Sequence, residues 1–314
     1  MTTPGGTASA LTDGSADDDP ATAVGVIGLG VMGAPMAGHM LRAGHRVHVT
    51  ARRPVSARAL VAAGAAWHAT ARELAGHVGV VVLVVPDLPD VEAVLDGPDG
   101  LLAGVTGPLV VVVSSTVSAE GVRALDRSVR DRTGGRVHVV DAPISGGEEG
   151  AVAGTLSVMV GGADEDVAAA LPVLASTGTA VHLGPVGSGQ VAKACNQMIV
   201  AATVLALGEA SVVAERAGLD VAATLDLLGG GYAGSRLLEV KKHRFARHDH
   251  SPSGPARFMV KDLGSATEEA RRSGTATPQL DVLREVFTDL TARGLGDQDT
   301  AVVQAYIEGL TRSE

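Results

Sequence analysis

The sequence has one cysteine, very few aromatic residues and no excess of basic charge. With Cys195 alone, no intrachain disulfide can form, and we expect a protein of the reducing cytoplasm. Aromatic residues make up 2% of the 314 residues, too few for a platform on which single-stranded nucleic acid stacks. The formal net charge of -10 also argues against nucleic acid as a partner.

Long apolar runs and a targeting segment are missing as well. No uninterrupted apolar stretch reaches the roughly 18 residues of a membrane-spanning helix, so we expect no membrane partner. The N-terminus lacks the basic start and apolar stretch of a signal peptide. Residues 1–22 are rich in Gly, Ser, Thr and Asp and cannot bury enough apolar area to order themselves. We therefore predict a disordered tail over 1–22.

Short apolar runs that alternate with helical patterns occupy the first half of the remaining chain. Such alternation, with strands apolar on both faces, is typical of an α/β fold with a doubly wound, mostly parallel sheet. We predict a Rossmann dinucleotide-binding domain over 23–184. Its strands are expected at 24–27, 45–50, 80–85, 109–113, 136–140 and 180–183.

The sequence pattern changes after "GPVGSGQ" at 184–190, from alternating strands and helices to helices alone. From Val191 to Ala217 the chain has no proline and a nearly continuous apolar face, which predicts one long helix of about 40 Å. The later residues have helical patterns throughout. We predict an all-α domain over 185–314, with further helices near 220–228, 233–247, 256–273, 278–293 and 298–310.

A glycine-rich loop follows the first predicted strand and opens a helix. In that context a GxGxxG string indicates a dinucleotide site, because the glycines allow a tight turn and close approach of the pyrophosphate to the helix N-terminus. The alternative is a plain glycine-rich turn. The predicted cofactor-binding loop comprises Gly28, Leu29, Gly30, Val31, Met32 and Gly33.

Two arginines stand where a dinucleotide site usually has an acidic residue. An Asp or Glu about 20 residues after the glycines would bind the ribose 2′-hydroxyl of NAD. Here the count reaches Arg52 and Arg53, whose guanidinium groups would pair with a 2′-phosphate. The sequence thus favours NADP(H), and the alternative is two solvated surface arginines.

The long helix contains one lysine among apolar residues. Asn196 and Gln197 follow Lys193 by three and four residues and therefore share its face. Burial would lower the pKa of Lys193 towards the range of a general acid or base. On periodicity alone, a surface lysine whose stem covers apolar neighbours remains the alternative. Cys195 is expected to be a small core residue.

Two other groups of polar residues carry less information. Lys261 and Asp262 form a charged pair in a predicted helix, which on its own indicates only a solvated face. His243, His248 and His250 cluster near a helix end, but their spacing matches no metal-ligand pattern. We expect no metal site.

Four blocks, in this order, resemble the β-hydroxyacid dehydrogenase family. They are "GVIGLGVMGAPMAGHMLRAGH", "DAPISGGEEGAVAGTLSVMVGG", "GPVGSGQVAKACNQM" and "KDLGSA", and the resemblance covers residues 23 to about 310. The family includes 3-hydroxyisobutyrate dehydrogenase, tartronate semialdehyde reductase and glyoxylate and succinic semialdehyde reductases. The resemblance implies reversible hydride transfer between a nicotinamide cofactor and a small β-hydroxy acid or its semialdehyde.

The resemblance also implies roles for individual residues. Lys193 would be the general acid/base, and Ser145, Gly146 and Gly147 would bind the substrate carboxylate. Asn196 or Gln197 would orient the substrate, and Lys261 would approach both cofactor and substrate. The remaining cofactor contacts would come from Val85, Pro86 and Thr116.

The chain departs from the family pattern at three places. NADP-linked members tend to have Asn-Arg-Thr where this chain has Ala51-Arg52-Arg53, so the arginine is kept and the asparagine is not. Gln197 stands where many members have asparagine, which leaves open which amide contacts the substrate. An aromatic residue usual after 229–235 is replaced by Arg236, which would favour a longer or doubly anionic acid.

Other functions fit the sequence less well. Imine reductases share the overall build but typically have Asp or Tyr in place of Lys193, and a non-catalytic cofactor-binding relative would lack this lysine. A decarboxylating enzyme of the 6-phosphogluconate type has a longer helical domain. The apolar faces of the predicted helices, together with the family resemblance, indicate a homodimer or homotetramer.

Overall fold

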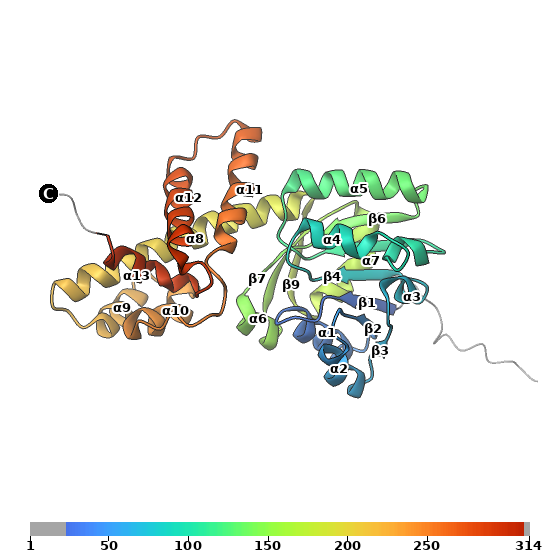
Figure 1. The fold of residues 1–314 in the computed structure, drawn as a ribbon, viewed down its shortest axis with the longest axis horizontal. Coiled ribbons are helices and arrows are strands. Elements are labelled where there is room, and N and C mark those ends of the chain that lie inside the picture. The colour runs from blue at the N-terminus through green and yellow to red at the C-terminus, as the bar shows by residue number, and fades with distance from the viewer. Residues whose placement is uncertain (1–22, 311–314) are drawn as a thin grey trace, which may run out of the picture.

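The computed structural model describes residues 23–310. The tail predicted over 1–22 lies outside these residues. The described chain forms a sheet-containing part and a helical part, and the long helix α8 (Ser188–Arg216) runs from one into the other (Figure 1). The change of sequence pattern near 184–190 corresponds to the start of this helix.

The sheet-containing part has the predicted doubly wound topology. Strands β1 to β6 are parallel and lie in the order β3-β2-β1-β4-β5-β6. Beyond β6, strand β8 is antiparallel to both β6 and β7, and β9 pairs parallel to β8. The strands are β1 (Ala23–Ile27), β2 (Arg46–Thr50), β3 (Ala66–Trp67), β4 (Val80–Leu83), β5 (Leu109–Val113), β6 (Val137–Asp141), β7 (Ile144–Ser145), β8 (Leu156–Gly161) and β9 (Gly178–Gly184).

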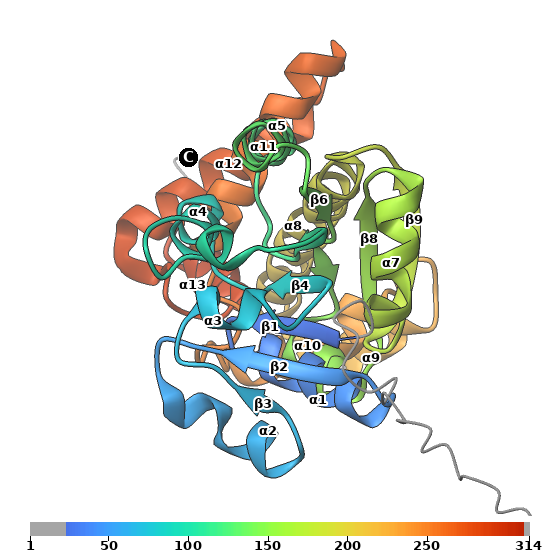
Figure 2. The ribbon, with the colours of Figure 1, turned by 90° about the vertical axis from the view of Figure 1, so that its right-hand side faces the viewer.

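Helices cover both faces of the sheet because its central strands are apolar on both sides. In β4, Val80 and Val82 face one hydrophobic core, and Val81 and Leu83 face the other. The first core packs against α1 (Gly33–Arg42), α2 (Arg58–Ala62), α6 (Gly147–Ala153) and α7 (Asp164–Ala175). The second packs against α3 (Ala71–Ala75), α4 (Leu88–Leu95) and α5 (Ala119–Thr133). These helices lie on the opposite face of the sheet from α1 and α7 (Figure 2).

The helical part forms a third core around α8. Val204 of α8, Phe245, Leu263 and Phe287 are fully buried there, one from each of four helices. The other helices are α9 (Val221–Gly229), α10 (Arg236–Arg247), α11 (Phe258–Ser273), α12 (Pro278–Leu290) and α13 (Val303–Glu308), with short turns at Thr291–Leu295 and Thr300–Val302.

Helix α8 is long and apolar enough to cross a bilayer by length and composition alone. Its most apolar 18-residue window has a mean hydropathy of 1.7, and 44% of that window is buried. In the fold the helix contacts β8 and β9 at its start and α10, α11 and α13 further along. Its length therefore serves to connect the two parts of the molecule.

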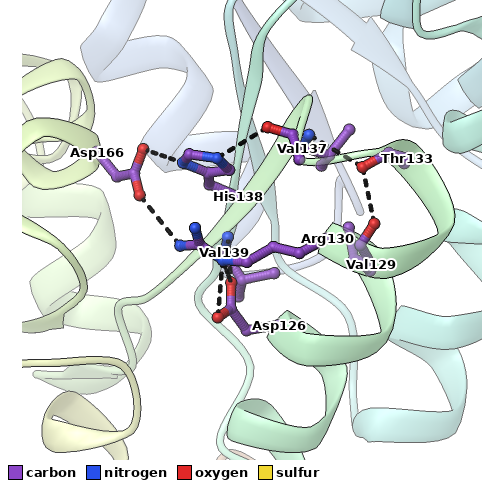
Figure 3. Close-up of polar contacts among 9 residues, drawn as sticks. Asp126, Val129, Arg130, Thr133, Val137, His138, Val139 and Asp166 are labelled. Carbon is purple, nitrogen blue, oxygen red and sulfur yellow. Dashed lines mark hydrogen bonds and ion pairs between the residues drawn. The ribbon is translucent and has the colours of Figure 1, made fainter.

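A polar network fixes β6 at its amino end (Figure 3). The Nδ1 atom of His138 lies 2.7 Å from Oδ1 of Asp166, and Arg130 donates to both oxygens of Asp126 at 2.9 and 3.0 Å. Asp126 in turn accepts the backbone N–H of Val139 at 3.1 Å. These contacts join β6 to α5 on one side and to α7 on the other.

Candidate active site

The glycine loop between β1 and α1 has the geometry of a dinucleotide site. Gly28 has φ +99°, and a Cβ there would lie 2.2 Å from the Val84 carbonyl oxygen. A Cβ at Gly33 would lie 2.0 Å from the Gly28 carbonyl oxygen, whereas nothing lies within 4 Å of a Cβ at Gly30. The outer glycines thus permit a tight turn and close helix packing, and the middle one borders open space at the start of α1. The loop fits a pyrophosphate.

The other predicted cofactor residues lie at the carboxyl ends of neighbouring strands. Arg52 and Arg53 follow β2 and are exposed. Val85 and Pro86 follow β4, which ends at Leu83, two residues before the predicted end. The loop after β5 joins them, because Ser115 Oγ donates to the Val85 carbonyl oxygen at 2.6 Å. Ligands of open α/β sheets bind at this edge.

The Ser145–Gly147 segment connects β7 to α6. Gly146 has φ +136° and Gly147 has φ +65°, conformations that favour glycine. Both glycines are exposed, and α6, which was not predicted, begins at Gly147. The first N–H groups of a helix lack intrahelical partners, so this turn can receive a carboxylate.

Lys193 is buried one and a half turns into α8. Its side chain is 7% exposed, so the surface alternative is wrong. Burial lowers the pKa of Lys193 from 10.5 to about 8, with Asp262 acting in the opposite direction and Lys261 adding to the decrease. An amine with this pKa is poised between its charged and neutral forms near neutral pH and can both donate and accept a proton.

The two amides after Lys193 have different surroundings. Ser145 Oγ donates to Asn196 Oδ1 at 3.3 Å, and Asn196 Nδ2 donates to Gln197 Oε1 at 2.9 Å. Gln197 is buried, and its Nε2 donates to Asp262 Oδ2 at 2.6 Å. Both ends of Gln197 are therefore bound within the protein, while half-buried Asn196 lies against the predicted carboxylate-binding turn.

Lys261 continues this chain of hydrogen bonds to the cofactor edge. Its Nζ atom lies 3.2 Å from Asp262 Oδ1 and donates to the carbonyl oxygen of Thr116 at 2.7 Å. A continuous path thus links Ser145, through α8 and α11, to the loop after β5. Asp262 is only 6% exposed and is the centre of this path. No local pattern indicates this role, since in the sequence Asp262 resembles an ordinary surface acid beside a lysine.

Other expectations for the helical part are changed by the structure. Cys195 is exposed and is not a core residue, because its face of α8 is uncovered. Arg236 is also exposed and pairs with Glu239 at 2.9 Å, and its helix α10 packs on α8 and α9. His248 lies at a helix end, as predicted, and pairs with acidic side chains, Glu215 at 3.4 Å and Glu308 at 3.2 Å.

A glycine loop at the switch point of a doubly wound sheet, with a buried lysine of lowered pKa, defines a dinucleotide-dependent oxidoreductase. Residues 23–187 match the NAD-binding domain of 6-phosphogluconate dehydrogenase. Residues 187–306 match the NAD-binding domain of NADP-dependent 3-hydroxyisobutyrate dehydrogenase. The two matches meet at Gly187, one residue before α8 begins.

Individual proteins agree with these matches. The chain is 37% identical to a probable 3-hydroxyisobutyrate dehydrogenase-like protein of Arabidopsis thaliana, over 94% of this chain and 91% of that protein. It is 37% identical to 2-hydroxy-3-oxopropionate reductase of Escherichia coli, over 90% and 96%. A 3-hydroxyisobutyrate dehydrogenase structure from Salmonella typhimurium has a TM-score of 0.82 at 28% identity, covering 90% of this chain and 99% of that one.

The chain therefore belongs to the β-hydroxyacid dehydrogenase family, as its sequence blocks predict. It is an NAD(P)-dependent oxidoreductase of that family. Imine reductases share its fold more distantly, with one from Myxococcus stipitatus at a TM-score of 0.60 and 16% identity. That likeness concerns the fold alone.

Proposed function

We propose that this enzyme interconverts a small β-hydroxy acid and its semialdehyde, with NADP(H) preferred over NAD(H). The observation that carries the proposal is the placement of Lys193. The lysine is buried, and its pKa lies near 8. Asn196 of the same helix accepts a hydrogen bond from the Ser145 hydroxyl. These contacts support the assignment of Lys193 to proton transfer and of the Ser145 turn to the substrate carboxylate.

The chemistry assigned to Lys193 is a single proton transfer. In oxidation, its neutral amine takes the proton of the substrate hydroxyl as the carbonyl group forms. In reduction, its ammonium returns that proton to the carbonyl oxygen. The nicotinamide cofactor, when bound, supplies or accepts the hydride.

The substrate is oriented by the turn and by one amide. The N–H groups at Ser145 to Gly147 would hold the carboxylate, and the Ser145 hydroxyl would add a hydrogen bond. Asn196 is the amide we assign to the substrate, because Gln197 is buried and bound at both ends. The 2-hydroxy-3-oxopropionate named for the Escherichia coli relative is a three-carbon acid aldehyde of the kind this arrangement suits.

The cofactor preference rests on Arg52 and Arg53. Both follow β2, the strand whose end faces the ribose in a dinucleotide fold, and both are exposed. Their guanidinium groups favour a 2′-phosphate, which an acidic residue here would repel. Lys261, bonded to the Thr116 carbonyl oxygen, is assigned to the nicotinamide side with Val85 and Pro86.

We further propose a homodimer or homotetramer. Ile199 and Val213, on α8, are 67% and 68% exposed, and Leu227 and Tyr232 are exposed near the end of α9. These apolar side chains are best covered by a second copy. Size-exclusion chromatography with light scattering tests this assembly. A cytoplasmic location without membrane or nucleic-acid partners stays a prediction.

The decisive experiment is a substrate panel run with both cofactors. Threonate, 3-hydroxy acids, serine, glyoxylate, succinic semialdehyde and a cyclic imine are assayed with NADPH or NADP+ and with NADH or NAD+. We expect turnover of a hydroxy acid or semialdehyde, with a higher kcat/KM for NADP(H) than for NAD(H). Turnover of the imine alone, or cofactor binding without turnover of any acid, would contradict the proposal.

A further inference from the structure

Asp141, the last residue of β6, holds the start of the helix that contains Lys193. The side chain is fully buried. Its Oδ1 accepts the backbone N–H of Gly187 at 2.6 Å, and its Oδ2 accepts that of Gln190 at 2.8 Å. Gly187 is the N-cap of α8, so Asp141 satisfies two of the free N–H groups of this helix from a distant strand.

The carboxylate lies in a cradle formed by glycines. A Cβ at Gly161 would lie 2.5 Å from Asp141 Oδ1 and 2.9 Å from the Gly189 nitrogen. A Cβ at Gly189 would lie 2.2 Å from the Met159 carbonyl oxygen and 2.8 Å from Asp141 Oδ2. No side chain larger than hydrogen fits at either position without displacing the carboxylate, so the position of α8 relative to β6 and β8 is closely defined.

The Gln190 side chain ties the same turn of α8 to β5. Its Oε1 accepts the Val117 N–H at 3.1 Å, and its Nε2 donates to the Ser115 carbonyl oxygen at 2.9 Å. Lys193 follows Gln190 by three residues, almost one helical turn. The first turn of α8 is thus fixed to the ends of β5 and β6, between the cofactor edge and the Ser145 turn.

We propose that Asp141 is a positioning residue whose ionised form holds Lys193 in register with the substrate, and whose protonation lowers turnover in acid. This inference rests on the proposed function of Lys193. A protonated carboxyl group presents one good acceptor in place of two, so one of the two N–H groups at the start of α8 loses its partner. An error of about 1 Å in the position of a reacting group is enough to slow catalysis by about 100-fold.

The surroundings of Asp141 place this protonation in an accessible range. Burial raises the pKa of Asp141 to about 6, and the two backbone N–H groups and Arg123 act in the opposite direction. Arg123 comes from α5, and its Nε donates to the Val186 carbonyl oxygen at 3.3 Å. The elements around Asp141 carry further ionisable groups, among them Glu120 of α5, His182 of β9 and Lys193 of α8, while His138 and Asp166 lie at the opposite end of β6.

The reductive direction separates the two titrating groups. Reduction requires the ammonium form of Lys193, which is already present below about pH 8. A fall in reductive kcat below about pH 6 therefore cannot come from Lys193, and a fall above about pH 8 can. The wild-type profile is expected to have both limbs.

The test compares reductive kcat from pH 5 to 9 in the wild type, in Asp141→Asn and in Asp166→Asn. Asn at 141 keeps the shape but offers one oxygen and turns an NH2 group towards a backbone N–H. We expect kcat at pH 7.5 to fall at least about tenfold, KM for the cofactor to change by less than about twofold, and the acid limb to disappear. Asp166→Asn disturbs a buried carboxylate at the other end of β6, and its profile should keep the wild-type shape.

Hydrogen exchange in the wild type gives a second readout that needs no substrate. Protection of the Gly187 and Gln190 amides, corrected for intrinsic exchange, should fall about tenfold between pH 7.5 and pH 5. It answers the question even where Asp141→Asn fails to fold or no acid is turned over. Equal protection at both pH values overturns the inference, as does an acid limb that persists in Asp141→Asn or vanishes in Asp166→Asn.

Discussion

Replacing Lys193 by methionine is expected to make the protein more stable while it loses activity. The folded protein holds an amine whose pKa is about 8, whereas the unfolded chain holds one at 10.5. At about 1.36 kcal/mol per pKa unit, keeping Lys193 charged in its buried site costs about 3 kcal/mol at pH 7. Methionine has no charge to bury and a similar length, so Lys193→Met removes this cost. The gain corresponds to roughly 6 to 12 °C in Tm.

The pH dependence identifies the cause of this gain. Because the pKa is lowered on folding, the wild type gains stability as pH rises from about 8 to 10.5, and its difference from Lys193→Met should shrink over that window. Differential scanning calorimetry at several pH values measures the difference, and kcat should fall at least about 100-fold. Lys242→Met, at an exposed lysine paired with Asp226, should change neither quantity. A variant no more stable than the wild type at pH 7, or a stability difference that does not change with pH, would refute the reasoning.

Three other substitutions test separate features. Arg52→Asp should raise KM for NADPH at least about tenfold and KM for NADH much less, because a carboxylate repels the 2′-phosphate; equal changes in steady-state kinetics would contradict this. Burial, followed by His68 and His77, lowers the pKa of His48 to about 4, so the wild type loses stability as pH falls from 6.5 towards 4. His48→Gln should therefore unfold at a lower pH in an acid titration followed by circular dichroism, and an unchanged midpoint would argue against it. Gly161→Ala places a methyl group 2.5 Å from Asp141 Oδ1 and should lower Tm and kcat together, whereas Gly107→Ala, with nothing within 4 Å, should change neither.

The strands and long helices could be predicted because their signals are local. Leu109–Val113 is a run of apolar residues between Pro108 and Ser114, and β5 matches it residue for residue. The short elements have no such signal. Helix α6 occupies a stretch whose glycines suggest a loop, and β7, only two residues long, is defined by its pairing with β8. Pairing between distant segments is not visible in a local pattern.

The same limit applies within the site. The spacing of Lys193, Asn196 and Gln197 put them on one face of α8, but it could not tell that Gln197 turns into the protein towards Asp262. Cys195, among apolar neighbours, was expected in the core and lies on the uncovered face. Asp141 stands at the end of a strand, where an acidic residue usually meets solvent. Its importance depends on two backbone N–H groups more than forty residues away, which only the fold brings near.

The glycine cradle at the start of α8 has a consequence for engineering new substrates into this enzyme. Gly161 and Gly189 have no room for a larger side chain. A library of variants that includes these positions would therefore consist mostly of proteins in which Lys193 is displaced. Glu148 and Glu149 follow the Ser145 turn and are exposed, and residues 230–235 lie outside the cradle. If the Ser145 turn binds the substrate as proposed, diversity at those positions leaves the contacts that hold the start of α8 unchanged. The contacts that position the lysine thus come from segments other than these exposed ones.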